Sequence, residues 1–140
     1  MNTSEILRPL YKGGKTIKVD ATAHSAYRFM QRAADFGAGP EGALATAKNI
    51  ADAIAVCRFT ETAQTAADAA AQRVSVLVKT EDGRELTVVL SVGRQTPTAQ
   101  HVTIVTCYFA REATREFMAE DEFRTRYASF TARLMSALSA

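Results

Sequence analysis

The sequence predicts a single α+β domain in which helices pack on a small antiparallel sheet. Three β-rich runs lie between residues 73 and 109, and Asp82 with Gly83 is typical of the tight turn of a hairpin. Apolar residues repeat at helical spacing on both sides of these runs. A length of 140 residues is usual for one domain, and the chain has no internal repeat or Gly/Ser linker. We therefore expect residues 1–140 to form one unit, with a meander of three or four antiparallel strands, N-terminal helices and a long C-terminal helix.

The N-terminal part predicts a short strand followed by a helix. Residues 1–14 have no regular pattern, whereas Lys15–Asp20 alternates as an edge strand does. Thr22 is a suitable N-cap for a helix from Ala23 to about Phe36, and Gly37 is suited to end it. Polar side chains fall on one side of this helix, so the other side is expected to pack on the sheet.

A second helix is expected from Pro40 to about Val56, because Pro is favoured in the first turn and alanine-rich apolar positions follow at helical spacing. The segment 60–72 consists mainly of Ala and Thr and has no large apolar residue. It is predicted to be either a weak helix or a mobile linker.

The three strands of the meander have high β-propensity and are expected at Arg73–Lys79, Arg84–Ser91 and His101–Phe109. A loop at Gly93–Ala99 joins the last two. The acidic residues 120–122 favour a helix N-terminus. The long terminal helix is indicated by apolar residues at helical spacing, namely Phe123, Tyr127, Phe130, Leu134 and Leu138.

Charge and cysteine content exclude several classes of protein. Seventeen Lys and Arg against fifteen Asp and Glu give a formal charge of +2, which is too small to indicate nucleic-acid binding by itself. Cys57 and Cys107 stand far apart without further ligand pairs and are interpreted as buried free thiols in a reducing compartment. Charged residues interrupt the N-terminus where a signal peptide would be apolar, and no apolar run could span a bilayer. We expect a protein that acts in the cytoplasm.

The usual motifs of nucleotide-binding proteins, serine hydrolases, zinc proteases and calcium-binding loops do not occur in the sequence. We therefore expect no cofactor and no metal.

The first candidate site lies on the predicted helix that begins at Ala23. His24, Arg28 and Arg32 are spaced to stack along one face of this helix. A histidine can transfer a proton near neutral pH, and arginines can hold a phosphodiester. The alternative is an ordinary solvated helix face.

The second candidate lies at the end of the third strand. Alternation predicts that Thr106 and Tyr108 point the same way as Val102 and Ile104, so that both hydroxyls could line one site, and that His101 points to the opposite face. The alternative is that Tyr108 caps the core with its hydroxyl in solvent.

Scattered cations supply a third hypothesis. Lys15, Lys18 and Arg58 are candidates for contacting a nucleic-acid backbone if the fold gathers them on one surface. Scattered cations are equally typical of an ordinary protein surface.

The order of these parts resembles the compact bacterial ribonuclease toxins of the RelE and barnase-like superfamily. The resemblance rests on the His-x-x-x-Arg-x-x-x-Arg pattern at residues 24–32 and on a last strand that ends in Thr-x-Tyr. It implies metal-independent RNA cleavage by attack of the 2′-hydroxyl on the adjacent phosphate. In that scheme His24 is the acid or base, Arg28 and Arg32 bind the phosphate, and Thr106 and Tyr108 shape the pocket.

The competing hypothesis is a protein-binding module, such as a bacterial or phage inhibitor, an immunity-like protein or a homodimer. The apolar face of the terminal helix, with Phe117 and Met118, could present more apolar surface than one sheet face can cover. These residues could instead all be core. We place the protein-binding module first and the ribonuclease second. The fold can discriminate between them, because a ribonuclease needs His24, Arg28 and Tyr108 to converge on one phosphate.

Overall fold

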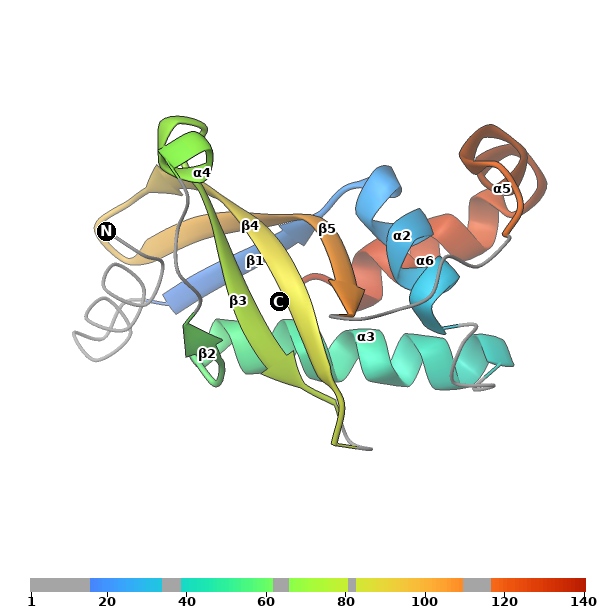
Figure 1. Ribbon diagram of the computed structural model, residues 1–140, viewed down its shortest axis with the longest axis horizontal. Coiled ribbons are helices and arrows are strands. Elements are labelled where there is room, and N and C mark those ends of the chain that lie inside the picture. The colour runs from blue at the N-terminus through green and yellow to red at the C-terminus, as the bar shows by residue number, and fades with distance from the viewer. Residues whose placement is uncertain (1–15, 34–38, 62–65, 81–82, 110–116) are drawn as a thin grey trace.

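The computed structural model describes residues 16–33, 39–61, 66–80, 83–109 and 117–140 (Figure 1). Five strands within these ranges form one sheet with the order β1-β5-β4-β3-β2. The strands are β1 Thr16–Ala21, β2 Thr60–Glu61, β3 Arg73–Lys79, β4 Glu85–Gln95 and β5 Ala99–Phe109. The helices are α2 Ala23–Ala33, α3 Gly39–Ala55, α4 Ala66–Ala70, α5 Glu120–Arg126 and α6 Ala128–Ala137.

The sheet is mixed, so the expectation of a purely antiparallel sheet was wrong. The predicted meander β3-β4-β5 is antiparallel throughout, and β2 adds an antiparallel edge to β3. Strand β1 forms the other edge, as expected for an edge strand, but it pairs in parallel with β5. A parallel neighbour needs a long crossover connection, and α2 and α3 lie within the chain that joins β1 to the meander.

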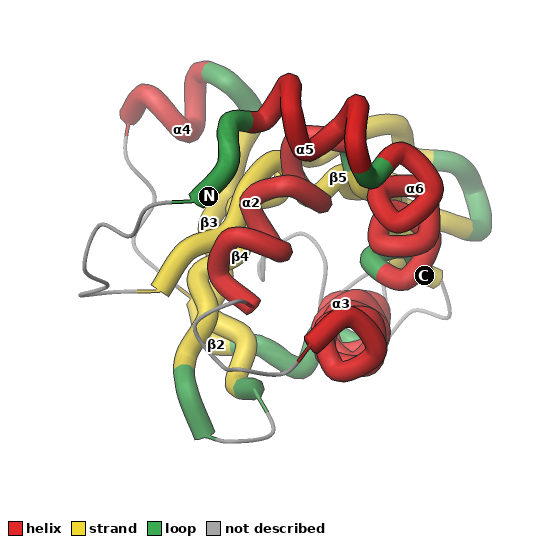
Figure 2. Tube along the Cα trace, turned by 90° about the vertical axis from the view of Figure 1, so that its right-hand side faces the viewer, coloured by secondary structure: helices red, strands yellow, loops and turns green. Residues whose placement is uncertain are grey.

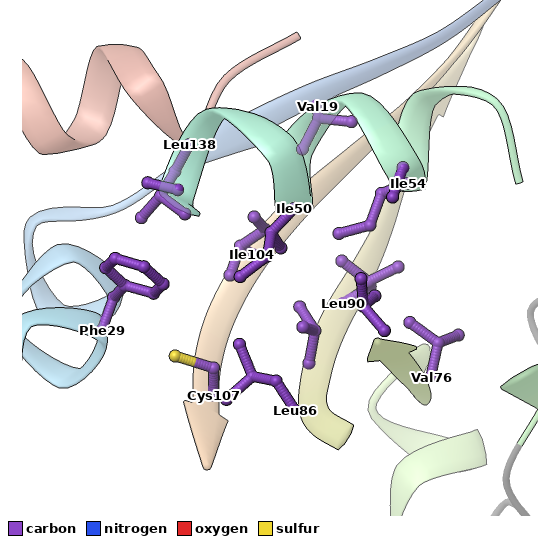
Figure 3. Close-up of a cluster of buried hydrophobic side chains, with 14 of the residues drawn as sticks. Val19, Phe29, Ile50, Ile54, Val76, Leu86, Leu90, Ile104, Cys107 and Leu138 are labelled. Carbon is purple, nitrogen blue, oxygen red and sulfur yellow. The ribbon is translucent and has the colours of Figure 1, made fainter. Parts of the chain in front are cut away.

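Helices α2, α3 and α6 contact the sheet and one another (Figure 2). Alternate residues of β3 point toward these helices and are buried, as the pattern of exposed and buried positions in this strand shows. Figure 3 shows Phe29 of α2 and Ile50 of α3 directed at the side chains of Leu86 and Ile104. The core therefore lies between one face of the sheet and the helices.

The N-cap predicted for the first helix is confirmed. The Ser25 amide donates to the Thr22 hydroxyl at 3.0 Å, and the Thr22 amide donates to the Ser25 hydroxyl at 2.9 Å. This reciprocal pair satisfies two backbone donors and fixes the turn from β1 into α2. The predicted end of this helix near Phe36 lies outside the described residues.

The C-terminal segment is not the long helix that the apolar spacing predicted. Tyr127, with φ −121° and ψ 44°, leaves the helical conformation and separates α5 from α6. Backbone bonds continue across the break, because the Tyr127 amide donates to Phe123 and the Thr131 amide donates to Tyr127. The helical spacing of apolar residues is therefore kept across the break, and Phe123 of α5 and Leu134 of α6 are both buried.

Several boundaries differ from the expected ones. Segment 60–72 contributes the edge strand β2 and the short helix α4, with residues 62–65 outside the described part. Strand β4 continues past Ser91 to Gln95 and β5 begins at Ala99, so the loop between them is shorter than Gly93–Ala99. The N-terminal segment 1–14 is not among the described residues.

Candidate functional site

His24 of α2 is engaged by a carboxylate. Its Nδ1 lies 2.7 Å from Oε1 of Glu120, the first residue of α5, and 49% of the imidazole side chain is exposed. The same carboxylate lies 3.4 Å from Nη1 of Arg124 through its other oxygen. The histidine is thus held against the start of α5, which the sequence pattern did not indicate.

An aromatic cluster fixes α5 against α2 and explains that contact. The Tyr27 hydroxyl donates to the Met118 carbonyl at 2.7 Å. The Tyr27 ring lies 5.8 Å from the ring of Phe117 and 5.6 Å from that of Phe123, between centroids. Such ring pairs add about 0.5–1.5 kcal/mol to simple burial. Phe117 and Met118 therefore belong partly to this cluster instead of forming a fully exposed apolar surface.

Arg28, one of the two arginines of the predicted phosphate site, is engaged by its own helix. Arg28 Nη1 donates to Oε1 of Gln31 on the same helix at 3.0 Å. Arg28 and Arg32 are both half-buried.

Thr106 and Tyr108 lie on the sheet face opposite the core, so the expected orientation was wrong. Residue 89 of β4 pairs with Thr106 whereas residue 90 pairs with Ile104, which leaves Val105 as the extra residue of a β-bulge. The bulge reverses the alternation, so that Cys107 is buried and Tyr108 is 40% exposed. Figure 3 shows the Cys107 side chain on the core side, beside Leu86.

The same bulge corrects the position of His101. Val102 and Ile104 lie on the core face before the bulge, and Cys107 lies on it after the bulge. His101 therefore lies on the opposite face, together with Thr106 and Tyr108. The neighbouring residue on β1 is Lys18, which pairs with His101 in register. The sequence gives no sign of this bulge, since no glycine marks it.

We name this surface the outer face of the sheet. It carries hydroxyl, apolar and charged side chains, most of them half-exposed, from four neighbouring strands. Its members are Lys18, Asp20, Arg73, Ser75, Leu77, Thr87, Val89, Ser91, His101, Thr103, Thr106 and Tyr108. Alternation in β3 and β4 would have identified the part that these two strands contribute, but it could not show which strands flank them.

One row of the outer face has opposite charges at its two ends. Register pairs Asp20 with Thr103, Thr103 with Ser91, and Ser91 with Arg73. The row therefore runs from an acidic residue on β1 through two hydroxyls to a basic residue on β3.

The candidate nucleic-acid contacts are not gathered on one described surface. Lys18 lies on the outer face at the β1 edge. Arg58 follows the end of α3, next to β2 at the opposite edge of the sheet. Lys15 lies outside the described residues. The two cysteines form no disulfide, with Cys107 buried as expected and Cys57 only half-buried.

Within the described ranges, no three His, Cys, Asp or Glu side chains cluster in a way that could hold a metal ion. None of the helices in those ranges has the length and apolar character needed to cross a membrane. Comparison of the chain with models of known protein families, with curated proteins and with solved structures found no match in any of the three.

Proposed function

We propose that this domain is a protein-binding module that pairs with a second copy of itself through the outer face of the sheet. The observation that carries this proposal is the charge order of the row Asp20, Thr103, Ser91 and Arg73. The cysteines Cys57 and Cys107, which form no disulfide, are in keeping with action in the cytoplasm.

The row is self-complementary under two-fold symmetry. Two outer faces can meet across a two-fold axis that runs parallel to the strands, between β5 and β4. This axis reverses the strand order of the second copy, so that β1 faces the partner's β3 and β5 faces the partner's β4. Asp20 of each copy then faces Arg73 of the other, and Thr103 faces Ser91. The same axis brings Thr106 opposite the partner's Val89, and these are the kinds of small and β-branched side chains that pack between stacked sheets.

The outer face is large enough for such a contact. Four strands spaced about 4.8 Å apart and about 25 Å long give a footprint of roughly 500 Å² per copy. Two copies would bury about 1,000 Å² in total, the lower limit of specific interfaces, so we expect a dimer that dissociates at micromolar concentration.

The positions of the predicted catalytic residues also favour a binding role. His24 contacts Glu120 on the helical side of the sheet, whereas Thr106 and Tyr108 lie on its outer face. A ribonuclease centred on His24 would need these groups around one phosphate.

Sedimentation velocity over a series from about 5 µM to about 500 µM tests the proposal. We expect the weight-average sedimentation coefficient to rise with concentration from monomer to dimer. Thr106→Lys should abolish the rise, because it puts a cation in the middle of the contact. Thr125→Lys is the matched control, since Thr125 is exposed on α5. A wild-type chain that stays monomeric throughout, or equal effects of both variants, would refute the proposal.

A ribonuclease remains the second candidate, now centred on His101. The observation in its favour is that His101, Thr106 and Tyr108 share the outer face and that Lys18 lies beside His101. A histidine could act as acid or base, the lysine could neutralise phosphate charge, and the tyrosine could stack on a base. His101 and Tyr108 are about 20 Å apart along the strand, which suits contact with several nucleotides.

Incubation of total RNA with the protein in EDTA tests this second candidate. Metal-independent cleavage that is lost in His101→Ala and kept in His24→Ala would support it. Cleavage lost only in His24→Ala would instead return the site to α2, and intact RNA would eliminate the activity.

A further inference from the structure

We propose that a cavity between α3 and the end of β3 binds a small phosphate monoester, with Arg58 and Lys79 holding the phosphate. The cavity has a volume of about 380 Å³, within the range of small-molecule sites. Within the described lining, Lys79 continues the outer-face positions of β3, so the cavity adjoins the end of that face. The charge row of the proposed dimer includes Arg73 at the other end of β3, so the two sites can be tested separately.

The described lining has the charge that an anion requires. Arg58 and Lys79 are its charged residues, and within the described part of the chain neither forms an ion pair. Thr80 and Asn49 also line the cavity. A phosphate can accept a forked pair of bonds from the guanidinium and a further charge-assisted bond from the ammonium group.

The backbone holds Arg58 in place at the end of α3. Cys57 adopts the left-handed conformation with φ +57°. The Cys57 amide donates to Ile54 at 3.0 Å, and the Arg58 amide donates to Ala53 at 2.7 Å. This pair of bonds is a Schellman motif, in which glycine is the usual residue at the left-handed position. A cysteine there costs conformational energy, and such strain is concentrated at functional sites.

Lys79 is held by the sheet. It is the last residue of β3 and pairs with Glu85 in register. Thr80 then closes the hairpin, because its amide donates to the Arg84 carbonyl at 2.7 Å and its hydroxyl accepts from the Arg84 amide at 3.1 Å. The backbones that carry the two cations are therefore fixed by hydrogen bonds, one in the turn after α3 and one at the end of β3, and such preorganisation lowers the entropic cost of binding.

Two apolar residues of the lining are the reason to choose an ester over a bare ion. Ile50 and Ala53 lie at the cavity and are 2% and 3% exposed. A cavity of about 380 Å³ is larger than one phosphate ion needs, so it has room for a ring against these two residues. Asn49 and Thr46 supply hydrogen-bonding groups at its wall.

Phenyl phosphate combines the two parts of the proposed ligand, whereas phenol lacks the charge and inorganic phosphate lacks the ring. We would follow the backbone amide signals of the full chain by NMR during titration with each compound. Phenyl phosphate is expected to bind at least tenfold more tightly than either fragment. The shifted signals should come from residues 46–58 and 79–80.

Variants of the two cations test their roles. Arg58→Gln and Lys79→Gln should each weaken phenyl phosphate binding about tenfold, because each removes a charge-assisted hydrogen bond. Lys48→Gln is the matched control, because it removes one positive charge from α3 itself. Lys48 is paired with Asp52 at 2.9 Å and is not among the residues that line the cavity. All three side chains are exposed, so the variants should fold.

Three results would overturn the proposal. The first is equal binding of phenyl phosphate and phenol, and the second is an effect of Lys48→Gln as large as that of Lys79→Gln. The third is tighter binding of an RNA oligonucleotide without terminal phosphate to the same amides, which would make the cavity part of a nucleic-acid surface.

Discussion

Gln100 supports the β4-β5 hairpin from inside the protein. Its side chain is 2% exposed, and Nε2 donates to the carbonyls of Gly93 at 3.0 Å and His101 at 2.9 Å. The strand register shifts at this point, between Val92 and Gln95. The side-chain amide thus ties β5 to the end of β4 where the regular pairing of the two strands is interrupted.

Gln100→Leu keeps a similar volume but removes the donor. Leaving buried carbonyls without a donor costs about 1–3 kcal/mol of unfolding free energy. A chain of 140 residues has an unfolding entropy of about 0.3 kcal/mol/K, so the expected fall in melting temperature is about 3–10 °C.

Gln100→Glu should make stability depend on pH. An ionised carboxylate would face the carbonyls of Gly93 and His101, so the folded state favours the protonated form and raises the pKa of the introduced carboxyl above its usual value of about 4.3. The unfolded state then releases the proton first. The variant should match wild type best below about pH 4 and lose about 1.4 kcal/mol per pH unit above that, until the raised pKa is reached.

Urea unfolding followed by circular dichroism between about pH 4 and pH 8 measures both effects, with the wild-type curve subtracted at each pH. If Gln100→Leu unfolds at the wild-type urea concentration, or the Gln100→Glu difference stays constant with pH, the assigned hydrogen bonds do not support the hairpin.

Four further substitutions test individual contacts and one turn conformation through urea or thermal unfolding. Tyr27→Phe should lower the unfolding free energy by about 1 kcal/mol, since the Met118 carbonyl loses its donor at 2.7 Å; an unchanged midpoint would contradict this. Thr22→Ala should cost about 1 kcal/mol, and Ser25→Ala should cost less when added to it than alone, because the two form one reciprocal pair; additive losses would disprove the pairing. Gly83→Ala should cost about 1–2 kcal/mol because φ is +87° there, and a melting temperature equal to wild type would show that the turn does not need this conformation.

Local patterns in the sequence predicted most of the elements. High β-propensity located β3, and Thr22 marked the start of α2, because both signals depend on residues that are close in the chain. The turn at Asp82 and Gly83 correctly indicated that β3 and β4 form a hairpin. These features required no knowledge of distant contacts.

Long-range pairing could not be predicted in the same way. The parallel partner of β1 lies about 80 residues further along the chain, and nothing in the local pattern of β1 specifies it. The conformational break at Tyr127 has neither Gly nor Pro to mark it, so no residue type in the sequence indicates it.

The candidate site was predicted least well, for one physical reason. A single extra residue at Val105 turned Thr106 and Tyr108 to the outer face and set His101 beside them. Period-two alternation assigns side chains to faces only when no bulge interrupts the strand. The Glu120 contact of His24 likewise depends on tertiary packing, since 96 positions separate the two residues.

Charge reversal at the two ends of the outer-face row tests the proposed dimer most directly. Asp20→Arg and Arg73→Asp should each weaken self-association at least tenfold in sedimentation velocity, because like charges would then face each other twice per dimer. The double variant should recover wild-type association to within about threefold. The corresponding changes at Glu122 and Arg126, an exposed pair on α5 at 3.3 Å, should have no effect. A double variant as weak as the worse single variant, or a wild-type chain that does not associate, would contradict the account.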